Sequence, residues 1–352
     1  MTMHKTTKST YLLQALKKRI GTMSSGERFP SVRTLMKEYG VSQFSLTPAI
    51  NRLEEEELIE RIVGKGTFVS RDGNDKLFRL VFMQEDWAID EFAFHSEIMI
   101  RRIAEERRYL YKKVVYQFHD GIYDELPFDH ADAIIMAPCR RDFTAKQLDV
   151  LLNAPIPVIM FRVGFPHSSI NFVNGDNVAS GMMAANHFID KGHRKLAILL
   201  AEPDGPTGHE LLYGFTQYAA SKGVKVTVID CKTRYGEIAA HNAYSKMKEY
   251  CSSQPIDFSA LFVSSDGSSL GVLKAIIDHG IKIPEDLQVM GFGGSPQVEL
   301  FRPSLSTVET PIPRMVNAVY EIIDQCAAEN KTHGCSRLIY PCVVERESTL
   351  KK

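Results

Sequence analysis

The ten residues QVMGFGGSPQ, at positions 288–297, could take part in chemistry. A short apolar run leads into Gly291, Gly293 and Gly294, and many phosphate-binding sites begin with a strand that enters a glycine-rich loop. The spacing is not that of a G-x-G-x-x-G dinucleotide loop, and no G-x-x-x-x-G-K-[ST] sequence occurs in the chain. The local pattern therefore does not predict a nucleotide site.

Other reactive side chains have spacings that do not suit catalysis. His187 and His193 are not spaced as a metal-binding pair, and the serines of SSDGSS at 264–269 lack the G-x-S-x-G pattern of a nucleophile. His209 and Glu210 are neighbours on a predicted helix, so their side chains diverge. We expect no enzyme activity, no cofactor and no metal.

Composition and charge favour a cytoplasmic protein whose basic N-terminal segment binds a polyanion. The chain has 352 residues, enough for two or three domains. Its six cysteines form no C-x-x-C pair, and neither a signal-peptide core nor an apolar run of membrane-spanning length is present. Residues 1–71 carry six Lys and six Arg against seven Glu, whereas the rest of the chain is net acidic.

The basic segment predicts three helices and a hairpin. Apolar residues at helical spacing indicate helices over 9–20, after Ser31, and after Ser42, with Gly40 ending the second. The last two form a helix-turn-helix. LIERIV and TFVS around Gly-Lys-Gly then predict a hairpin, which completes a winged helix-turn-helix of α+β class.

This segment resembles the DNA-binding domain of the GntR family. The resemblance rests on GERFPSVRTLMKEYG, VSQFSLTPAINRL and GKGTFV, three motifs in family order within residues 10–70. Helix-turn-helix proteins read base edges with the first residues of the second helix, while other groups bind phosphates. The predicted DNA-binding residues are Ser31, Arg33, Ser42, Gln43, Ser45, Thr47, Arg52, Lys65 and Gly66.

Two departures from the family affect the second helix. Gln43 and Thr47 stand where the family usually has Arg, and Gln can make a bidentate contact to adenine instead. Pro48 would be the sixth residue of a helix that follows Ser42, where proline costs about 3 kcal/mol or forces a kink. We therefore expect this helix to bend or to start later, near Ser45.

The acidic part of the chain alternates predicted strands and helices. This alternation favours doubly wound parallel sheets, and a division near 171–176 favours two lobes with a ligand cleft beyond the strand ends. The predicted strands are 77–83, 112–118, 132–138, 156–161, 195–201, 224–230, 260–265 and 287–292.

Residues 77–350 resemble the effector domain of the LacI/GalR family, which is related to periplasmic sugar-binding proteins. INFVNGDNVASGMMAANHFIDKGHRKLAIL, IPEDLQVMGFGGSPQVELFRPSLSTVETP and PCVVERESTL carry the resemblance. A GntR-type head on a LacI-type body is the architecture of arabinose-type repressors. The resemblance implies that 288–297 lines an effector cleft. It also implies that three usual sugar anchors are replaced, by Leu211, Ser265 and Gly293.

Several polar or aromatic residues remain as effector-binding candidates: Asp86, Trp87, Arg140, Arg162, Asp176, Tyr235, Asp266 and Gly293. The loss of acidic anchors together with two arginines near strand ends suggests an acidic effector, such as a sugar acid or sugar phosphate. Structural roles fit as well: Trp87 in a core, Asp266 as a helix cap near Gly267, and Arg140 as a solvated cation.

The sequence thus predicts a winged-helix domain at 1–71, a linker at 72–76 and an effector and dimerisation domain at 77–352. Its lobes cover about 77–172 and 173–300, with crossing strands and a shared C-terminal segment. We expect a cytoplasmic homodimer that represses carbohydrate genes from a palindromic DNA operator under control of a small effector, without a membrane partner. The alternative is a solute-binding protein or sensor with a degenerate cleft.

Overall fold

The structure is a computed structural model. It describes residues 8–24, 26–56, 58–62, 66–70, 78–86, 91–117, 121–138 and 143–350. The chain divides into two compact units, Met1–Leu77 and Phe78–Lys352, here called unit 1 and unit 2. The predicted linker at 72–76 lies outside the described residues. No helix of the described part is both long and apolar enough to cross a membrane.

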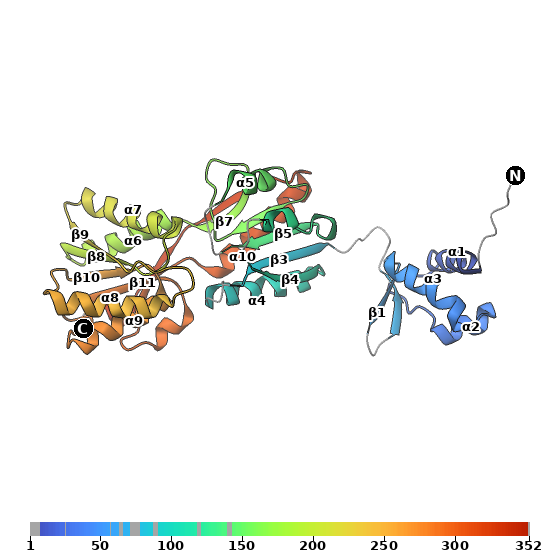
Figure 1. Cartoon of the computed structure of the whole chain (residues 1–352), viewed down its shortest axis with the longest axis horizontal. Helices are drawn as coiled ribbons and strands as arrows, with labels where there is room; N and C mark the ends of the chain where they lie inside the picture. Colours follow the sequence, from blue (N-terminus) through green and yellow to red (C-terminus); the bar gives the residue numbers. More distant parts are fainter. Residues whose placement is uncertain are drawn as a thin grey trace. The chain divides into compact units, whose positions relative to one another are not determined.

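Unit 1 contains three helices and a two-stranded antiparallel hairpin (Figure 1), namely α1 (Lys8–Ile20), α2 (Val32–Tyr39), α3 (Gln43–Glu55), β1 (Ile59–Ile62) and β2 (Gly66–Val69). Its core contains Leu16, Leu35, Leu46 and Leu53, all fully buried. Gly40 ends α2 in the left-handed conformation, with φ 62°. This arrangement confirms the predicted winged helix.

Helix α3 corrects one expectation. It begins at Gln43 rather than near Ser45, and it contains Pro48 in its interior. Because proline has no N–H, the carbonyl of Phe44 lacks its usual partner four residues later. One turn away, the Thr47 hydroxyl donates to the carbonyl of Gln43 at 2.9 Å. Of the two predicted alternatives, the later start is therefore wrong, because the proline lies within the helix, and the bend stays a prediction.

Unit 2 has two lobes, each built on a six-stranded sheet. The order is β13-β7-β6-β5-β3-β4 in the first lobe and β14-β12-β11-β10-β8-β9 in the second. All neighbouring strands are parallel except β14, which runs antiparallel to β12. The strands are β3 (Arg79–Glu85), β4 (Leu110–Tyr116), β5 (Ala133–Ala137), β6 (Val158–Phe161), β7 (Asn171–Gly175), β8 (Lys195–Leu200), β9 (Lys225–Asp230), β10 (Ala260–Val263), β11 (Gln288–Gly293), β12 (Ser306–Glu309), β13 (Ser336–Ile339) and β14 (Cys342–Val344).

Helices cover both faces of each sheet, as expected for doubly wound folds (Figure 1). In the first lobe, α4 and α10 share a buried cluster with one face, and α5 packs on the other. In the second lobe, α8 and α9 cover one face and α6 and α7 the other. The helices are α4 (Glu91–Glu106), α5 (Ala145–Leu152), α6 (Asn177–Asp190), α7 (Pro206–Ser221), α8 (Ala239–Ser253), α9 (Asp266–Asp278) and α10 (Ile312–Ala328), and the short 3-10 helices are η1 (Ile122–Glu125), η2 (Phe128–His130), η3 (Pro296–Leu300) and η4 (Glu347–Thr349).

The chain passes between the lobes three times. The passages follow β7, follow β12, and connect β13 to β14. All eight predicted strands are present, but β7, β12, β13 and β14 were not predicted. These four strands flank the crossings, so the lobes are joined by segments that come from distant parts of the sequence.

Candidate functional site

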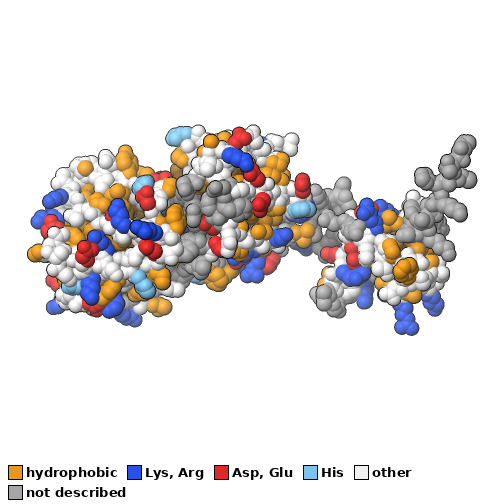
Figure 2. Space-filling view, in the orientation of Figure 1, with side chains coloured by type: hydrophobic (Ala, Val, Ile, Leu, Met, Phe, Trp, Pro, Cys, Tyr) orange, Lys and Arg blue, Asp and Glu red, His pale blue; other side chains and the backbone are white. Residues whose placement is uncertain are grey.

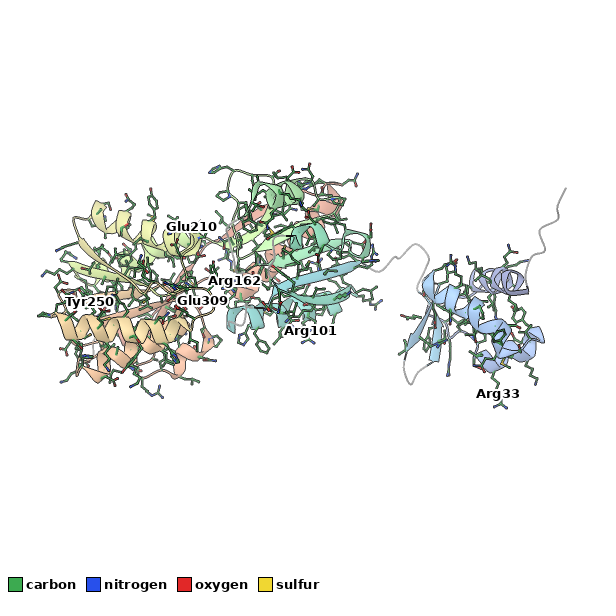
Figure 3. All side chains as sticks on the ribbon, in the orientation of Figure 1. Arg33, Arg101, Arg162, Glu210, Tyr250 and Glu309 are labelled. Atoms are coloured by element: carbon green, nitrogen blue, oxygen red, sulfur yellow. The ribbon has the colours of Figure 1, made fainter. Side chains whose placement is uncertain are left out.

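The solvent side of α2 and α3 presents the residues predicted to bind DNA. Ser31 caps α2, its hydroxyl accepting from the N–H of Thr34 at 3.2 Å. Arg33 follows it and projects from the unit into solvent (Figure 3). Ser42 stands at the N-cap of α3 without a side-chain capping bond, and Gln43 is exposed. Figure 2 shows basic side chains projecting from unit 1.

The other predicted DNA-binding residues have more constrained positions. The Ser45 hydroxyl lies 3.2 Å from that of Ser42, and exposed Thr47 bonds to the helix backbone. Arg52 Nε is 3.2 Å from Glu56 Oε1, so this guanidinium is held beside a carboxylate at the end of α3. Gly66 begins β2 with φ 121°, and Lys65 lies outside the described residues.

Two further exposed residues of unit 1 were not predicted from the sequence as DNA-binding residues. Phe44, in the first turn of α3, is 90% exposed. Arg28 is exposed, its backbone bridges to Phe68, and its guanidinium lies against Gly66. Arg28 therefore places a cation beside the first residue of β2, at the end of the strand pair nearest the turn.

Unit 2 contains a cavity of about 530 Å³ between its lobes. Its walls come largely from the carboxyl ends of parallel strands, where ligands bind in doubly wound folds. Aromatic rings from both lobes contribute apolar surface: Phe82, Phe92, Phe161, Tyr235, Phe292 and Phe301. The cavity has the size and the mixed lining of a small-molecule site.

The structure brings four of the predicted effector-binding residues to this cavity, namely Arg162, Tyr235, Asp266 and Gly293. Asp86 is an exposed residue after β3 and is not among the lining residues. Asp176 is likewise absent from the lining, and its carboxylate caps α6 by accepting from the N–H of Ala179 at 2.8 Å. Trp87 and Arg140 lie outside the described residues.

Asp266 holds the glycine-rich loop in place. Its carboxylate accepts from the N–H groups of Gly294 and Ser295 at 2.7 and 2.8 Å and from the Thr307 hydroxyl at 2.8 Å. A Cβ on Gly291 would lie 2.2 Å from Asp266 Oδ1, so only glycine leaves room for this carboxylate. Burial raises the pKa of Asp266 to about 6, although these hydrogen bonds act in the opposite direction. Ser265, not Asp266, occupies the N-cap of α9.

The loop therefore has a structural explanation for its composition. Gly294 has φ 82°, in the region that favours glycine. Ser295 then caps η3, its hydroxyl accepting from the N–H of Gln297 at 3.4 Å, with Pro296 at the first helical position. The backbone N–H groups that could have bound a phosphate are bound by Asp266.

Arg162 follows β6 in a conformation that non-glycine residues seldom adopt, with φ 68°. Its backbone N–H donates to the carbonyl of Val173 at 2.8 Å, and its guanidinium lies 4.7 Å from the centre of the Phe92 ring. Strain of this kind concentrates at functional sites. Figure 3 shows Arg162 at the junction of the lobes.

Two polar residues that lie where the chain passes between the lobes also line the cavity. They were not predicted from the sequence as effector-binding residues. Asn174 is the residue before the last of β7 and is 7% exposed, and Thr310 follows β12 and is 5% exposed. Among the described residues, the Thr310 hydroxyl has no hydrogen-bond partner. A Cβ on Gly175 would lie 2.7 Å from this hydroxyl, so Thr310 sits directly against the other crossing strand. A buried hydroxyl without a partner is costly and is available to a ligand.

An acidic side chain that was not predicted from the sequence also lines the cavity. Glu202 lines it after β8, and its Oε1 accepts from the Ser268 hydroxyl at 2.8 Å. The inference that the cleft had lost its acids is therefore wrong. Leu211, which stands at a family sugar-anchor position, is fully buried in the core of the second lobe and does not line the cavity.

Comparisons with known domains agree with this division of the chain. Residues 10–69 match the model of bacterial regulatory proteins of the gntR family. Residues 185–349 match the model of the periplasmic binding protein-like domain.

Curated proteins that match part of the chain are transcription regulators of distant similarity. The chain is 26% identical over 199 residues to the HTH-type transcriptional regulator CelR of Thermobifida fusca, covering 56% of this chain and 57% of CelR. It is 24% identical over 168 residues to the HTH-type transcriptional repressor PurR of Haemophilus influenzae, covering 47% of this chain and 49% of PurR. The chain thus spans about half the length of these relatives.

Solved structures share the architecture of unit 2. The Escherichia coli transcriptional repressor ascG matches with a TM-score of 0.63 and 21% identity, covering 77% of this chain and 98% of that structure. A periplasmic binding protein/LacI transcriptional regulator of Alkaliphilus metalliredigens, complexed with D-xylulofuranose, matches with a TM-score of 0.62 and 22% identity, covering 78% and 99%. The fold is therefore a GntR-type helix-turn-helix domain followed by a two-lobed, periplasmic-binding-protein-like domain of the kind found in LacI regulators.

Proposed function

We propose that this protein is a DNA-binding transcription regulator, a repressor of carbohydrate-utilisation genes, and not an enzyme. The observation that carries the proposal is one chain with both a gntR-type helix-turn-helix and an inter-lobe cavity. A solute-binding protein would need the cavity but not unit 1. The combination of domains is that of arabinose-type repressors, and such a regulator acts in the cytoplasm with its DNA.

The effector couples to DNA through the angle between the lobes. Lining residues come from both lobes and from the crossings, so a bound ligand favours one lobe arrangement over others. In a dimer, a change of lobe angle alters the spacing of the two DNA-binding domains and therefore the affinity for a palindromic operator.

A homodimer has a candidate contact surface on α9 and η3. Leu270 and Ile277 are 55% and 48% exposed and line a hollow together with Phe301. Leu300, the residue before Phe301, is 77% exposed. The two α9 residues are seven apart and share one helix face. Sedimentation velocity at micromolar concentration tests this assignment, and a monomer in the presence of DNA would contradict it.

DNA binding by the α2–α3 surface predicts a specific loss in an Arg33→Ala variant. Arg33 is exposed, and a lost phosphate contact should reduce the slope of log affinity against log salt by about 0.9. Fluorescence anisotropy with a random-sequence duplex over a salt series measures this slope. Arg19→Ala is the control, because Arg19 bonds to Glu38 within unit 1. Equal slopes for Arg33→Ala and the wild type would contradict the assignment.

If the effector binds where the chain passes between the lobes, a Thr310→Val variant should keep or gain stability and lose affinity for the effector. The change removes a buried hydroxyl without a partner, so the ligand-free protein should be unchanged or more stable by about 1 kcal/mol. If the hydroxyl binds the effector, affinity should fall about 5- to 30-fold, a typical loss for one hydrogen bond. The control is Thr216→Val, whose hydroxyl bonds to Leu212 in α7.

The measurement begins with a thermal-shift screen of neutral sugars, sugar acids and sugar phosphates on the full chain. Ligands that raise the melting temperature are then titrated by calorimetry against the wild type and both variants. Equal affinity for the wild type and Thr310→Val would remove Thr310 from the site. Arg162 supports an acidic effector and Glu202 supports hydroxyl groups, so binding of neutral sugars alone would reject the acidic class.

A further inference from the structure

The solvent side of α3 carries an aromatic ring that the packing of unit 1 does not explain. Leu46, Ala49, Ile50 and Leu53 are buried and form the inner face of the helix. Phe44 lies on the other side and is 90% exposed, more than any other large apolar side chain among the described residues. Since burial of such a ring is strongly favourable, its exposure at this point favours a partner.

The surroundings of Phe44 fit DNA better than an apolar protein surface. Thr47, Pro48 and Asn51 share its face at helical spacing, and all are exposed, so the ring is not part of a broad apolar patch. Between Gln43 and Arg52 the helix contains no acidic residue, while Arg33 is exposed on α2. The surface around the ring is therefore polar and free of negative charge on this helix.

Two of the acids that follow are paired with cations of the same unit. Glu54 pairs with Arg61 at 2.9 Å, and Glu56 pairs with Lys17 and Arg52. Their charges are partly compensated inside unit 1, and they lie at the opposite end of α3 from Phe44. The N-terminal half of α3 can thus approach a polyanion.

We propose that Phe44 reads the 5-methyl group of thymine in the major groove. This inference rests on the proposed DNA-binding function and deepens it. Thymine is the base that offers an apolar group to the major groove, and phenylalanine is among the side chains that contact it. Gln43, the preceding residue, is exposed and can bind adenine by two hydrogen bonds. Together they specify a half-site in which a thymine methyl accompanies an adenine.

Phe44 and Gln43 also provide base specificity in place of the arginines that the family usually has at positions 43 and 47. A methyl contact adds discrimination without charge, so it does not depend on salt as a phosphate contact does. Pro48, one turn after Phe44, adds apolar surface on the same face. The structure therefore assigns base reading to a residue that the family comparison left without a role.

The test uses the full chain and duplex DNA selected by the wild type from a random-sequence pool. Each thymine of the selected duplex is replaced in turn by deoxyuridine, which removes only the 5-methyl group. At one thymine per half-site, the wild type should lose affinity about three- to tenfold, the range expected for burial of one or two methyl-sized groups. The Phe44→Ala variant should lose less than about twofold at the same position.

Control variants separate this role from general effects. The Phe44 side chain is 90% exposed, so Phe44→Ala should keep the wild-type melting temperature. Phe94→Ala removes a 59% exposed ring from unit 2 and should leave the deoxyuridine effect unchanged.

Three outcomes would overturn the inference, and a fourth would overturn the proposed DNA-binding function on which it rests. If the wild type tolerates deoxyuridine at every position, or if Phe44→Ala stays as sensitive as the wild type, Phe44 does not read the methyl group. If Phe44→Ala loses equal affinity for thymine and deoxyuridine duplexes, the ring only positions the helix. If the wild type selects no duplex at all, the proposed DNA-binding function fails first.

Discussion

Replacing Asp266 with alanine is expected to lower the free energy of unfolding of unit 2 by about 2 to 4 kcal/mol and to weaken effector binding. The variant leaves the N–H groups of Gly294 and Ser295 and the Thr307 hydroxyl without their acceptor. The loop that they hold forms one wall of the cavity. Chemical denaturation followed by circular dichroism measures the stability, and the thermal-shift screen measures binding.

The same carboxyl group makes a pH-dependent contribution whose sign follows from its raised pKa. The pKa rises from 3.8 to about 6 on folding, because burial disfavours the charge. The folded state therefore binds the proton more tightly, so the contribution of Asp266 to stability is largest below pH 3.8 and declines as the pH rises through about 6. The wild type should lose stability relative to Asp266→Asn over this interval.

The control for both measurements is Asp204→Ala, because the Asp204 side chain is 91% exposed. It should neither unfold the loop nor change the pH profile. Parallel pH profiles for the wild type and Asp266→Asn would show that Asp266 titrates normally. An Asp266→Ala protein with wild-type stability would show that its hydrogen bonds are replaceable.

A Gly214→Ala variant should lose about 3 kcal/mol of stability, the upper part of the usual range for overpacking. The added Cβ would lie 2.0 Å from the carbonyl oxygen of Val178 and 3.1 Å from the nitrogen of Met182. Both neighbours are backbone atoms of α6, so no side-chain rotation relieves the clash. The helices must separate, which opens the buried cluster around Phe215. Urea denaturation of the full chain tests this.

Gly208→Ala is a matched control because it lies on the same helix. Outside the backbone of α7 itself and the residues next to Gly208, no atom of the described residues lies within 4 Å of a Cβ added at Gly208. Alanine also favours the helix over glycine, so stability should stay constant or rise by up to about 1 kcal/mol. Equal stabilities for Gly214→Ala and Gly208→Ala would mean that α6 and α7 can separate without cost.

The fold was largely readable from sequence because its central strands are apolar runs between amphipathic helices. IPVIMF and KLAILLA are long and apolar enough to stand out. The edge and crossing strands do not stand out in this way. β7 reads NFVNG and β14 has three residues, so their strand character depends on partners far away in the sequence.

The site residues also differ in how far they could be predicted, because some belong to a local sequence motif and others come together only in the folded chain. Residues beside glycine-rich or capping motifs, such as Asp266 and Gly293, could be selected from sequence. Asn174 and Thr310 could not, because they come to the same cavity only through two separate passages of the chain between the lobes. Phe44 did carry a local signal: it is apolar yet lies off the face of Leu46, Ile50 and Leu53.

The three crossings have a consequence for the order in which the chain can fold during synthesis. β13 completes the first sheet beside β7, and β14 completes the second beside β12, so both sheets need residues 336–344. The core of the first lobe also requires α10. Unit 1 is contiguous and can form as soon as it leaves the ribosome, whereas the two lobes must both wait until residues 336–344 have been synthesised. A nascent chain would thus carry a folded helix-turn-helix unit before the cavity between the lobes can form.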